Sequence, residues 1–409
     1  MMGKKSVPQL RFPEFEGEWK IDKIGKYIDL ISGYSFKGNE IVEDSTGVCI
    51  LRGINITEGY IRHSIEIDRF YIGDTSKLVK YILETGDIVL GMDGSKVGRN
   101  VALIGKEDKG SILVQRVARI RGLENADIKF IYTQIFSSKF HKYVDVVNTS
   151  SGIPHISAKQ IRDYIIGFPT LPEQQKIASF FTAIDKKIAL LKQKHEQLEQ
   201  YKKGVMQKIF AQEIRFKDDD GNNYPDWVEM KLGEVSDYKN GGSFEKLVVE
   251  SGSYNLITLN SIDINGKLKL THKKVAETDN SLKIDDLVMV LSDVAHGNFL
   301  GLTDIIPDNS YVLNQRMGAL KPKIEINRYY LKTFINFNQM YFKLMGQGSS
   351  QQNLSKSDIL KFTVQVPNKE EQTKIAKFLS SIDKKIEKVQ LQIEKAEEWK
   401  KGLLGRMFC

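Results

Sequence analysis

The sequence predicts two tandem α/β (α+β) domains, each followed by a long helix, with the two helices paired as an antiparallel coiled coil with pseudo-twofold symmetry. Three observations support this fold class. Phrases recur at an offset of 198 residues, such as "EQQKIA" from Glu173 and "EQTKIA" from Glu371. Apolar residues recur every seven positions near the end of each repeat, which is typical of coiled coils. The remaining parts contain short apolar runs bounded by Gly and Asp, which are typical of strands and turns.

The composition limits the class of protein. The chain has 409 residues, so two or three domains are expected. Its net charge of +8 suits a polyanionic partner, although such an excess is also common among proteins that bind none. Cys49 and Cys409 have no CxxC spacing, which argues against a disulfide framework or a zinc site. No stretch approaches the roughly 18 apolar residues of a membrane helix, and we expect a cytoplasmic protein.

Residues 1–170 are expected to form the first domain. The runs "VCILRGINI", "GDIVLG" and "VARIRG" have the character of short strands, and "IKFIYTQIFSSKFHKYVDVV" has helical spacing. The polar loop "NTSSGIPHIS" follows this helix, and the loop "GMDGSKVGRN" contains Lys96 and Arg99. Such loops can contact bases and phosphates, or they can be simple turns with local hydrogen bonds.

Residues 171–211 are expected to form the first long helix. Pro172 and Glu173 suit a helix start, and Glu173–Phe210 would span about 57 Å. A helix of that length with one apolar stripe needs a partner, which the second copy can supply. The predicted seam consists of Ile177, Phe181, Ile184, Ile188, Leu191, Leu198 and Val205.

Residues 212–368 are expected to form the second domain, and residues 369–409 the second long helix. The second domain has its own polar loop, "GQGSSQQNLS". The seam of the second helix is predicted to consist of Ile375, Leu379, Ile382, Ile386, Val389, Ile393 and Leu403. His195, Lys202 and Lys400 fall at positions expected to be apolar. The alternative is that these are long amphipathic helices that pack on their own domains.

The sequence contains no recognisable catalytic constellation. It has no phosphate-binding P-loop motif, no HExxH, no G-x-S-x-G and no Pro-Pro pair of the amino-methyltransferase type. Its six histidines show no metal-ligand spacing, so we expect neither a metal nor a cofactor. The segment "PDWVEMK" has the residue types of a metal-dependent nuclease, but Trp19 and Trp227 recur at both domain entries and indicate packing.

The two helical phrases carry a family resemblance. "LPEQQKIASFFTAIDKKIALL" and "EEQTKIAKFLSSIDKKIEKV", with the ending "YKKGVMQKIF", resemble the specificity subunit of type I restriction-modification systems over essentially the whole chain. The resemblance implies that each variable domain is a target recognition domain that reads half of a bipartite double-stranded DNA site. It also implies a coiled coil that docks two methyltransferase subunits, a restriction (translocase) subunit in the full complex, and no catalysis by this chain.

Because the family's DNA contacts lie in variable loops, the candidate residues here follow from side-chain chemistry. In the first domain they are Lys37, Arg52, Asn55, Ser95, Lys96, Arg99, Ser150, Ser151 and His155. In the second they are Lys246, Asn260, His296, Asn298, Ser349, Gln351, Gln352 and Asn353. The pairs Gln115–Arg116 and Gln315–Arg316 recur at matching places, so they are either structural or involved in DNA binding.

The sequence leaves two other functions as alternatives. A fused enzyme would carry its own methylating or cleaving activity, which the missing motifs oppose. A coiled-coil adaptor without a DNA role would bind its partner in a manner insensitive to salt, whereas phosphate contacts weaken steeply as salt rises.

Overall fold

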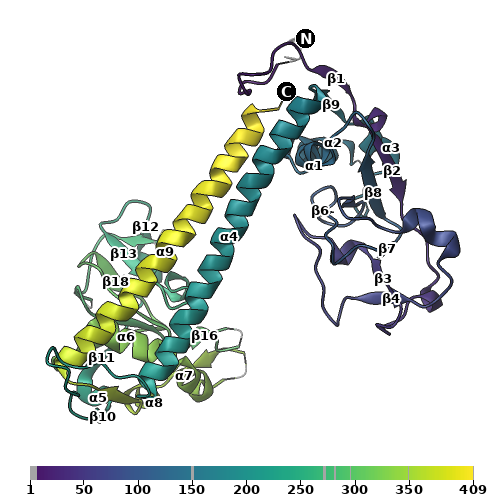
Figure 1. Cartoon of the computed structure of the whole chain (residues 1–409). Helices are drawn as coiled ribbons and strands as arrows, with labels where there is room; N and C mark the ends of the chain where they lie inside the picture. Colours follow the sequence, from purple (N-terminus) through teal and green to yellow (C-terminus); the bar gives the residue numbers. More distant parts are fainter. Residues whose placement is uncertain are drawn as a thin grey trace. The chain divides into compact units, whose positions relative to one another are not determined.

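The computed structural model describes residues 7–148, 152–269, 273–280, 282–294, 296–348 and 350–408. The chain forms two compact units (Figure 1). Unit 1 contains the residues up to Lys192 and those from Leu391 onward, and unit 2 is Gln193–Gln390. The two long helices, α4 (Leu171–Phe210) and α9 (Lys369–Arg406), are therefore each divided between the units.

Unit 1 is built on a four-stranded antiparallel sheet with the strand order β2-β8-β5-β6, beside a three-stranded sheet with the order β4-β3-β7 and the pair β1-β9. The strands are β1 (Lys20–Lys23), β2 (Ile28–Ser32), β3 (Val48–Leu51), β4 (Arg69–Tyr71), β5 (Ile88–Gly91), β6 (Val101–Leu103), β7 (Ile112–Leu113), β8 (Val117–Gly122) and β9 (Ile165–Phe168). The helices are α1 (Ile128–Ile135), α2 (Ser138–Val147) and α3 (Ala158–Asp163), with short 3-10 turns at Ile24–Lys26, Gly38–Glu40, Gly53–Asn55 and Ser76–Tyr81.

The central strand β5 is buried along its whole length because it is covered on both faces. Successive side chains of a strand point to opposite faces of the sheet. Ile88 and Leu90 join the large core that contains α1, and Val89 joins a second core with Leu51 and Leu113 of the smaller sheet. The run "GDIVLG" is therefore a strand, as predicted.

Unit 2 repeats this arrangement. Its main sheet has the order β11-β19-β15-β17, and its other sheets are β12-β14-β13-β18, β10-β21 and β16-β20. The strands are β10 (Val228–Lys231), β11 (Ser236–Asn240), β12 (Val248–Val249), β13 (Tyr254–Ile257), β14 (Lys274–Val275), β15 (Leu287–Val290), β16 (Ser292–Asp293), β17 (Thr303–Ile305), β18 (Tyr311–Leu313), β19 (Met317–Pro322), β20 (Gln352–Asn353) and β21 (Thr363–Val366). The helices are α5 (Leu232–Val235), α6 (Arg328–Phe337), α7 (Gln339–Met345) and α8 (Lys356–Leu360), with 3-10 turns at Glu245–Leu247 and Leu259–Ser261.

The long helices pack against each other in an antiparallel manner within each unit. In unit 1 the start of α4 contacts the end of α9, and the rings of Phe181 and Phe408 stack at 5.9 Å. In unit 2 the end of α4, at Ile209 and Phe210, shares a core with Ile375 and Leu379 near the start of α9. The predicted antiparallel coiled coil is confirmed, and none of the predicted seam residues is exposed.

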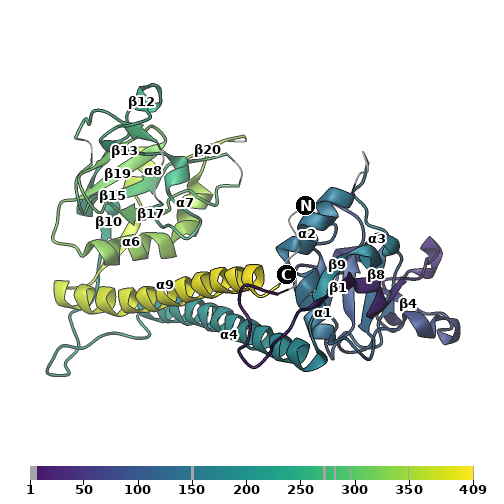
Figure 2. The ribbon, with the colours of Figure 1, turned by 90° about the horizontal axis from the view of Figure 1, so that it is seen from above.

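The helices also pack on their own domains, so the alternative interpretation holds in part. The core of unit 1 contains α1 residues such as Phe130 together with Ile177 of α4. In unit 2, α6 lies along α9 (Figure 2). The Tyr329 hydroxyl of α6 donates a hydrogen bond to Asp383 of α9. Each long helix therefore serves two apolar surfaces, which explains why its apolar stripe is wide near its first turns.

Lysines at seam positions are neutralised across the helix pair. The Lys400 ammonium lies 2.5 Å from the Asp185 carboxylate in unit 1, and the Lys202 ammonium lies 2.6 Å from Asp383 in unit 2. Both aspartates belong to the repeated phrase "IDKKI". The phrase recurs because the same ion pair is built once in each unit. His195 is half-buried, with Glu199 3.7 Å away on the same helix.

A buried carboxylate fastens each long helix to its domain. The carboxylate of Glu173 accepts two hydrogen bonds of 2.7 Å from the Arg11 guanidinium and one of 3.2 Å from the Trp19 indole. In unit 2 the Arg215 guanidinium and the Trp227 indole donate to Glu371, the latter at 2.9 Å. Trp19 and Trp227 also pack on the hydrophobic cores of their units, as predicted.

Gln174 and Gln372, which follow the two glutamates in the sequence, make a second link between each long helix and its domain. The Gln174 side chain accepts from the Asp127 amide at 3.0 Å and donates to the Pro169 carbonyl at 3.0 Å. Gln372 makes the equivalent bonds in unit 2, to the Asn327 amide and the Pro367 carbonyl. Because Asp127 and Asn327 cap α1 and α6, these glutamines join the start of a long helix to the start of a short one.

We expect Glu371→Ala to lower the free energy of unfolding by about 3–5 kcal/mol, because it leaves the Arg215 guanidinium without its buried partner. The neighbouring Glu370 is exposed, and Glu370→Ala is the matched control, with an expected change within about 0.5 kcal/mol. Urea denaturation of both variants measures the difference. Equal midpoints for the two variants would contradict the role of Glu371.

Unit 1 should lose stability as the pH rises through the titration of His63. Its imidazole bonds to Asp68 at 3.1 Å and Asp108 at 2.8 Å. Burial disfavours the charged ring, but these hydrogen bonds outweigh it and raise the pKa of His63 above 6.5. The stabilisation is therefore complete below the unfolded pKa and is lost as the pH rises through the higher folded pKa. Thermal unfolding at stepwise increasing pH should show this loss of stability, and the variant His63→Gln should lack it. A pH profile that is the same in the parent and the variant would disprove the role of His63.

Candidate nucleic-acid interface

Three segments of unit 1 that are distant in sequence meet at the ends of β5 and β8. The Met92 amide donates to the Arg116 carbonyl at 2.9 Å, and the Gly94 amide donates to the Pro154 carbonyl at 3.0 Å. Asp93 and His155 form an isolated β-bridge. We call residues 92–99, 115–116 and 152–156 loop surface 1.

Loop surface 1 contains several of the predicted residues. Ser95, Lys96 and His155 are exposed. Lys96 has Glu58 at 3.5 Å, and Arg99 makes an ion pair with Asp145 at 2.7 Å that raises the pKa of Arg99. The two predicted serines Ser150 and Ser151 lie outside the described residues.

Unit 2 has an equivalent loop surface 2, formed by residues 291–294, 296–298, 315–316 and 350–354. The Leu291 amide donates to the Arg316 carbonyl at 3.0 Å, as Met92 does to Arg116. Here β16 pairs with β20, and the Ser292 hydroxyl donates to the Asn353 side chain at 2.6 Å. The stretch "GQGSSQQNLS" therefore contains a short strand, β20, that the sequence did not indicate.

The predicted residues on loop surface 2 differ in how far their side chains are exposed to solvent. His296 and Asn353 are exposed, and Gln351 and Gln352 are half-buried. Asn298 is exposed at its edge, where its side chain accepts from the Lys343 ammonium at 2.7 Å. Ser349 lies outside the described residues.

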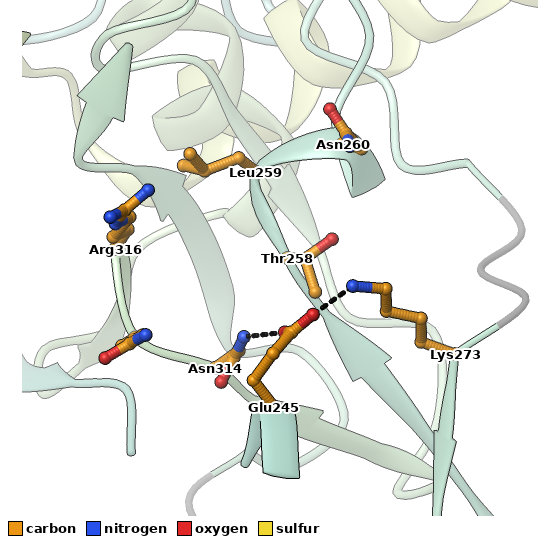
Figure 3. A pocket seen from close by; sticks show the side chains of 8 residues that line it. Glu245, Thr258, Leu259, Asn260, Lys273, Asn314 and Arg316 are labelled. Atoms are coloured by element: carbon orange, nitrogen blue, oxygen red, sulfur yellow. Dashed lines mark hydrogen bonds and ion pairs between the residues drawn. The ribbon is translucent and has the colours of Figure 1, made fainter. Parts of the chain in front are cut away.

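A pocket of about 250 Å³ opens beside the Gln315–Arg316 turn in unit 2 (Figure 3). Its lining residues are Glu245, Thr258, Leu259, Asn260, Lys273, Asn314, Gln315 and Arg316. The Glu245 carboxylate pairs with Lys273, which lowers the pKa of Glu245, and it accepts from the Asn314 amide at 2.9 Å. The predicted residue Asn260 lies here, and Lys246 is exposed in the adjoining 3-10 turn.

One predicted residue has a structural role instead, and a second is partly enclosed. Asn55 is fully buried, and its amide donates to the Arg62 carbonyl at 3.2 Å and to Asp68 at 3.0 Å. Its assignment to the DNA-contacting set is wrong, because no ligand can reach it in the folded unit. Arg52 donates to the Ile67 carbonyl, and burial lowers the pKa of Arg52. Lys37 is exposed, two residues after Ser35, whose hydroxyl donates to Gln115 at 2.8 Å.

The pairs Gln115–Arg116 and Gln315–Arg316 belong to loop surfaces 1 and 2. The sequence had left open whether these pairs are structural or bind DNA. Both pairs are exposed between buried neighbours, and each lies beside the loops named above. The signal in the sequence was their recurrence at matching places. Their backbone conformation, with a φ of 66° at Arg116 and 68° at Arg316, could not be read from the sequence.

Within the described ranges, no group of three or more His, Cys, Asp or Glu side chains is placed to hold a metal ion. Of the helices that the structure describes, none combines the length and apolar character needed to cross a membrane.

Comparison with known proteins identifies the family. The model of the type I restriction modification DNA specificity domain matches residues 16–200 and again residues 224–397. The chain is 27% identical to the type I restriction enzyme MjaVIII specificity subunit of Methanocaldococcus jannaschii, over 99% of this chain and 94% of the relative. It is 32% identical to the Escherichia coli EcoAI specificity subunit, over 39% of this chain and 27% of that relative.

Solved structures show the same fold. The S subunit of a type I restriction-modification system from M. genitalium superposes with a TM-score of 0.62 at 19% identity, covering 98% of this chain and 99% of that chain. The two matches of the family model lie one in each half of the chain and take in most of both long helices. The chain therefore belongs to the family of type I restriction-modification DNA specificity subunits, which recognise DNA and are not catalysts themselves.

Proposed function

We propose that the chain reads an asymmetric, bipartite double-stranded DNA target, one half-site with each unit. The observation that carries this proposal is that two loop surfaces of the same construction display different side chains. Loop surface 1 presents Ser95, Lys96 and His155, and loop surface 2 presents His296 and Asn353 at related places. Base edges in the major groove are distinguished by such donors and acceptors, so different side chains should read different half-sites.

The proposed boundaries keep residues 1–170 and 212–368 as target recognition domains, with residues 171–211 and 369–409 as the helical scaffold. The proposed DNA-contacting set keeps the accessible predicted residues and omits Asn55. It contains Lys37, Ser95, Lys96, Arg99 and His155 in unit 1, and Lys246, Asn260, His296, Asn298, Gln351, Gln352 and Asn353 in unit 2. Arg52, Ser150, Ser151 and Ser349 stay as proposals without structural support.

We further propose that the helical scaffold docks two methyltransferase subunits, and that a restriction (translocase) subunit joins the full complex in the cytoplasm. Tyr201 of α4 is 53% exposed and Trp399 of α9 is 54% exposed, although large aromatic residues are usually buried. They are 198 residues apart, so each unit presents one at the equivalent place. Exposed aromatics of this kind are typical anchors of protein interfaces. A solved type I system with a TM-score of 0.57 to this chain is described in terms of complex assembly, which supports partners of this class.

Single-molecule methylation sequencing tests the DNA target directly. With the gene intact, the host genome should carry a two-part, asymmetric adenine-methylated motif with a fixed gap, and the motif should vanish when the gene is deleted.

A variant carrying His296→Ala and Asn353→Ala should relax one half-site and leave the other unchanged, because both side chains lie on loop surface 2. The matched variant Ser95→Ala with His155→Ala should affect only the other half-site. A change in both halves from either variant would contradict separate readout, and methylation or cleavage by the purified chain alone would revive the fused-enzyme alternative.

The length of the helical scaffold should set the gap between the half-sites, because α4 leads from one unit into the other. A seven-residue insertion at matched places, after Glu196 and after Glu394, preserves the heptad register and adds about 10.5 Å to each helix. We expect the gap in the methylated motif to lengthen by up to about three base pairs, with both half-sites unaltered. An equal insertion in the exposed turn at Asp219–Asp220 is the control and should leave the gap unchanged. Loss of one half-site with an unchanged gap would contradict the scaffold role.

A further inference from the structure

Two matching turns in the two units hold an arginine in an unfavourable backbone conformation. Gln115 and Arg116 join β7 to β8, and Gln315 and Arg316 join β18 to β19. Arg116 has a φ of 66° and Arg316 a φ of 68°, the left-handed region that residues other than glycine rarely adopt. In a turn with a positive φ at its third residue, glycine is the preferred residue there.

The same contacts hold the backbone of both turns. The Arg116 carbonyl accepts from the Met92 amide at 2.9 Å, and the Arg316 carbonyl accepts from the Leu291 amide at 3.0 Å. On the other side, a neighbouring segment approaches so closely that it requires glycine. A Cβ atom on Gly33 would lie 2.2 Å from the Val114 carbonyl oxygen, and one on Gly241 would lie 1.9 Å from the Asn314 oxygen. The strained conformation persists because packing on both sides fixes it.

This rigid backbone carries an accessible positive charge. The Arg116 side chain is 65% exposed, and its guanidinium lies 3.1 Å from the Asp93 carboxylate. Arg316 is exposed and lines the pocket together with Lys273 and Asn260 (Figure 3). A guanidinium offers parallel N–H donors that match the two oxygens of a phosphate, and a fixed backbone reduces the entropy lost on binding.

The side chains around Arg116 and Arg316 differ, although the two turns have the same backbone conformation. The residue before the Gln-Arg pair is the apolar Val114 in unit 1 and the polar Asn314 in unit 2. Gln115 accepts from the Ser35 hydroxyl in unit 1, whereas Asn314 accepts from the Phe244 amide in unit 2. An element that both units share cannot distinguish two different half-sites. Phosphate contacts position a protein on the duplex without reading its sequence, so a shared element suits them.

We propose that Arg116 and Arg316 each bind a phosphodiester group of the DNA backbone and thereby set the position of their unit on its half-site. This inference rests on the proposed DNA target and adds to it which residues anchor the backbone. The divergent side chains of loop surfaces 1 and 2 then read base edges from a position that the arginines fix.

Arg116→Gly and Arg316→Gly, made separately in the full-length chain, test the proposal. Glycine suits the positive φ, so the turn is kept while the cation is removed. The dissociation constant of the protein–DNA complex is measured for a duplex that contains the motif found by methylation sequencing and for a duplex of scrambled sequence. Both are measured between about 50 and 200 mM salt. Each variant should weaken binding to both duplexes by the same factor and lower the salt slope by about one unit. Its thermal midpoint should equal or exceed that of the parent.

Two control variants separate charge from geometry. Lys77 is exposed on a 3-10 turn of the same unit, and Lys77→Gln should leave the salt slope unchanged although it also removes one positive charge. Arg116→Lys keeps the charge but loses the paired donors, so it should keep the salt slope and bind more weakly than the parent.

Three outcomes would overturn the proposal, and they are distinguishable. Loss of binding to the motif alone, with an unchanged salt slope, would make the arginine a base reader. A lower thermal midpoint with unchanged DNA binding would assign it a structural role, through Asp93 in the case of Arg116. A parent chain whose DNA binding is absent or insensitive to salt would disprove the proposed DNA target itself, and the arginine anchor with it.

Discussion

The buried carboxylates of Glu173 and Glu371 are the constraint on which the architecture depends. A charge removed from water is costly unless it is paired and hydrogen-bonded, so each glutamate requires its arginine and its tryptophan in place. Both partners come from the segment that enters the domain, some 150 residues away in the chain. Each long helix therefore begins at one defined place on its domain, and its first turn favours the negative charge.

Two ion pairs between the long helices fix the register in which these helices pack. Apolar packing alone would tolerate several registers of two long helices, but Lys400–Asp185 and Lys202–Asp383 are each satisfied in one register only. Because the partner lysine of each "IDKKI" phrase comes from the other helix, neither helix can vary alone. This mutual dependence gives a physical reason for two nearly identical helical phrases beside divergent domains.

The exposed side chains of the loop surfaces are free to differ because this common framework does not depend on them. Their contacts to the framework are made by backbone amides, such as those of Met92 and Leu291, and by buried apolar side chains, such as Val97 and Leu354. Side chains at Ser95, His155 and His296 point into no core and can change without disturbing the sheet. In the proposed function, the framework sets the position of each unit and the loops choose the bases, so a new target needs new loops only.

The sequence by itself determined the duplication, the heptad seam and the absence of known catalytic motifs, because periodicity and short motifs are local properties of the chain. It also placed Lys96, His155 and Asn353 in loops, which the structure shows to lie on the two loop surfaces. Burial and long-range contacts were decided only in the tertiary structure. Asn55 has the chemistry of a base reader but is enclosed by Arg62 and Asp68, and the strained φ of Arg116 and Arg316 depends on strands far away in sequence. These features arise from packing between distant segments, which no local pattern of residues encodes.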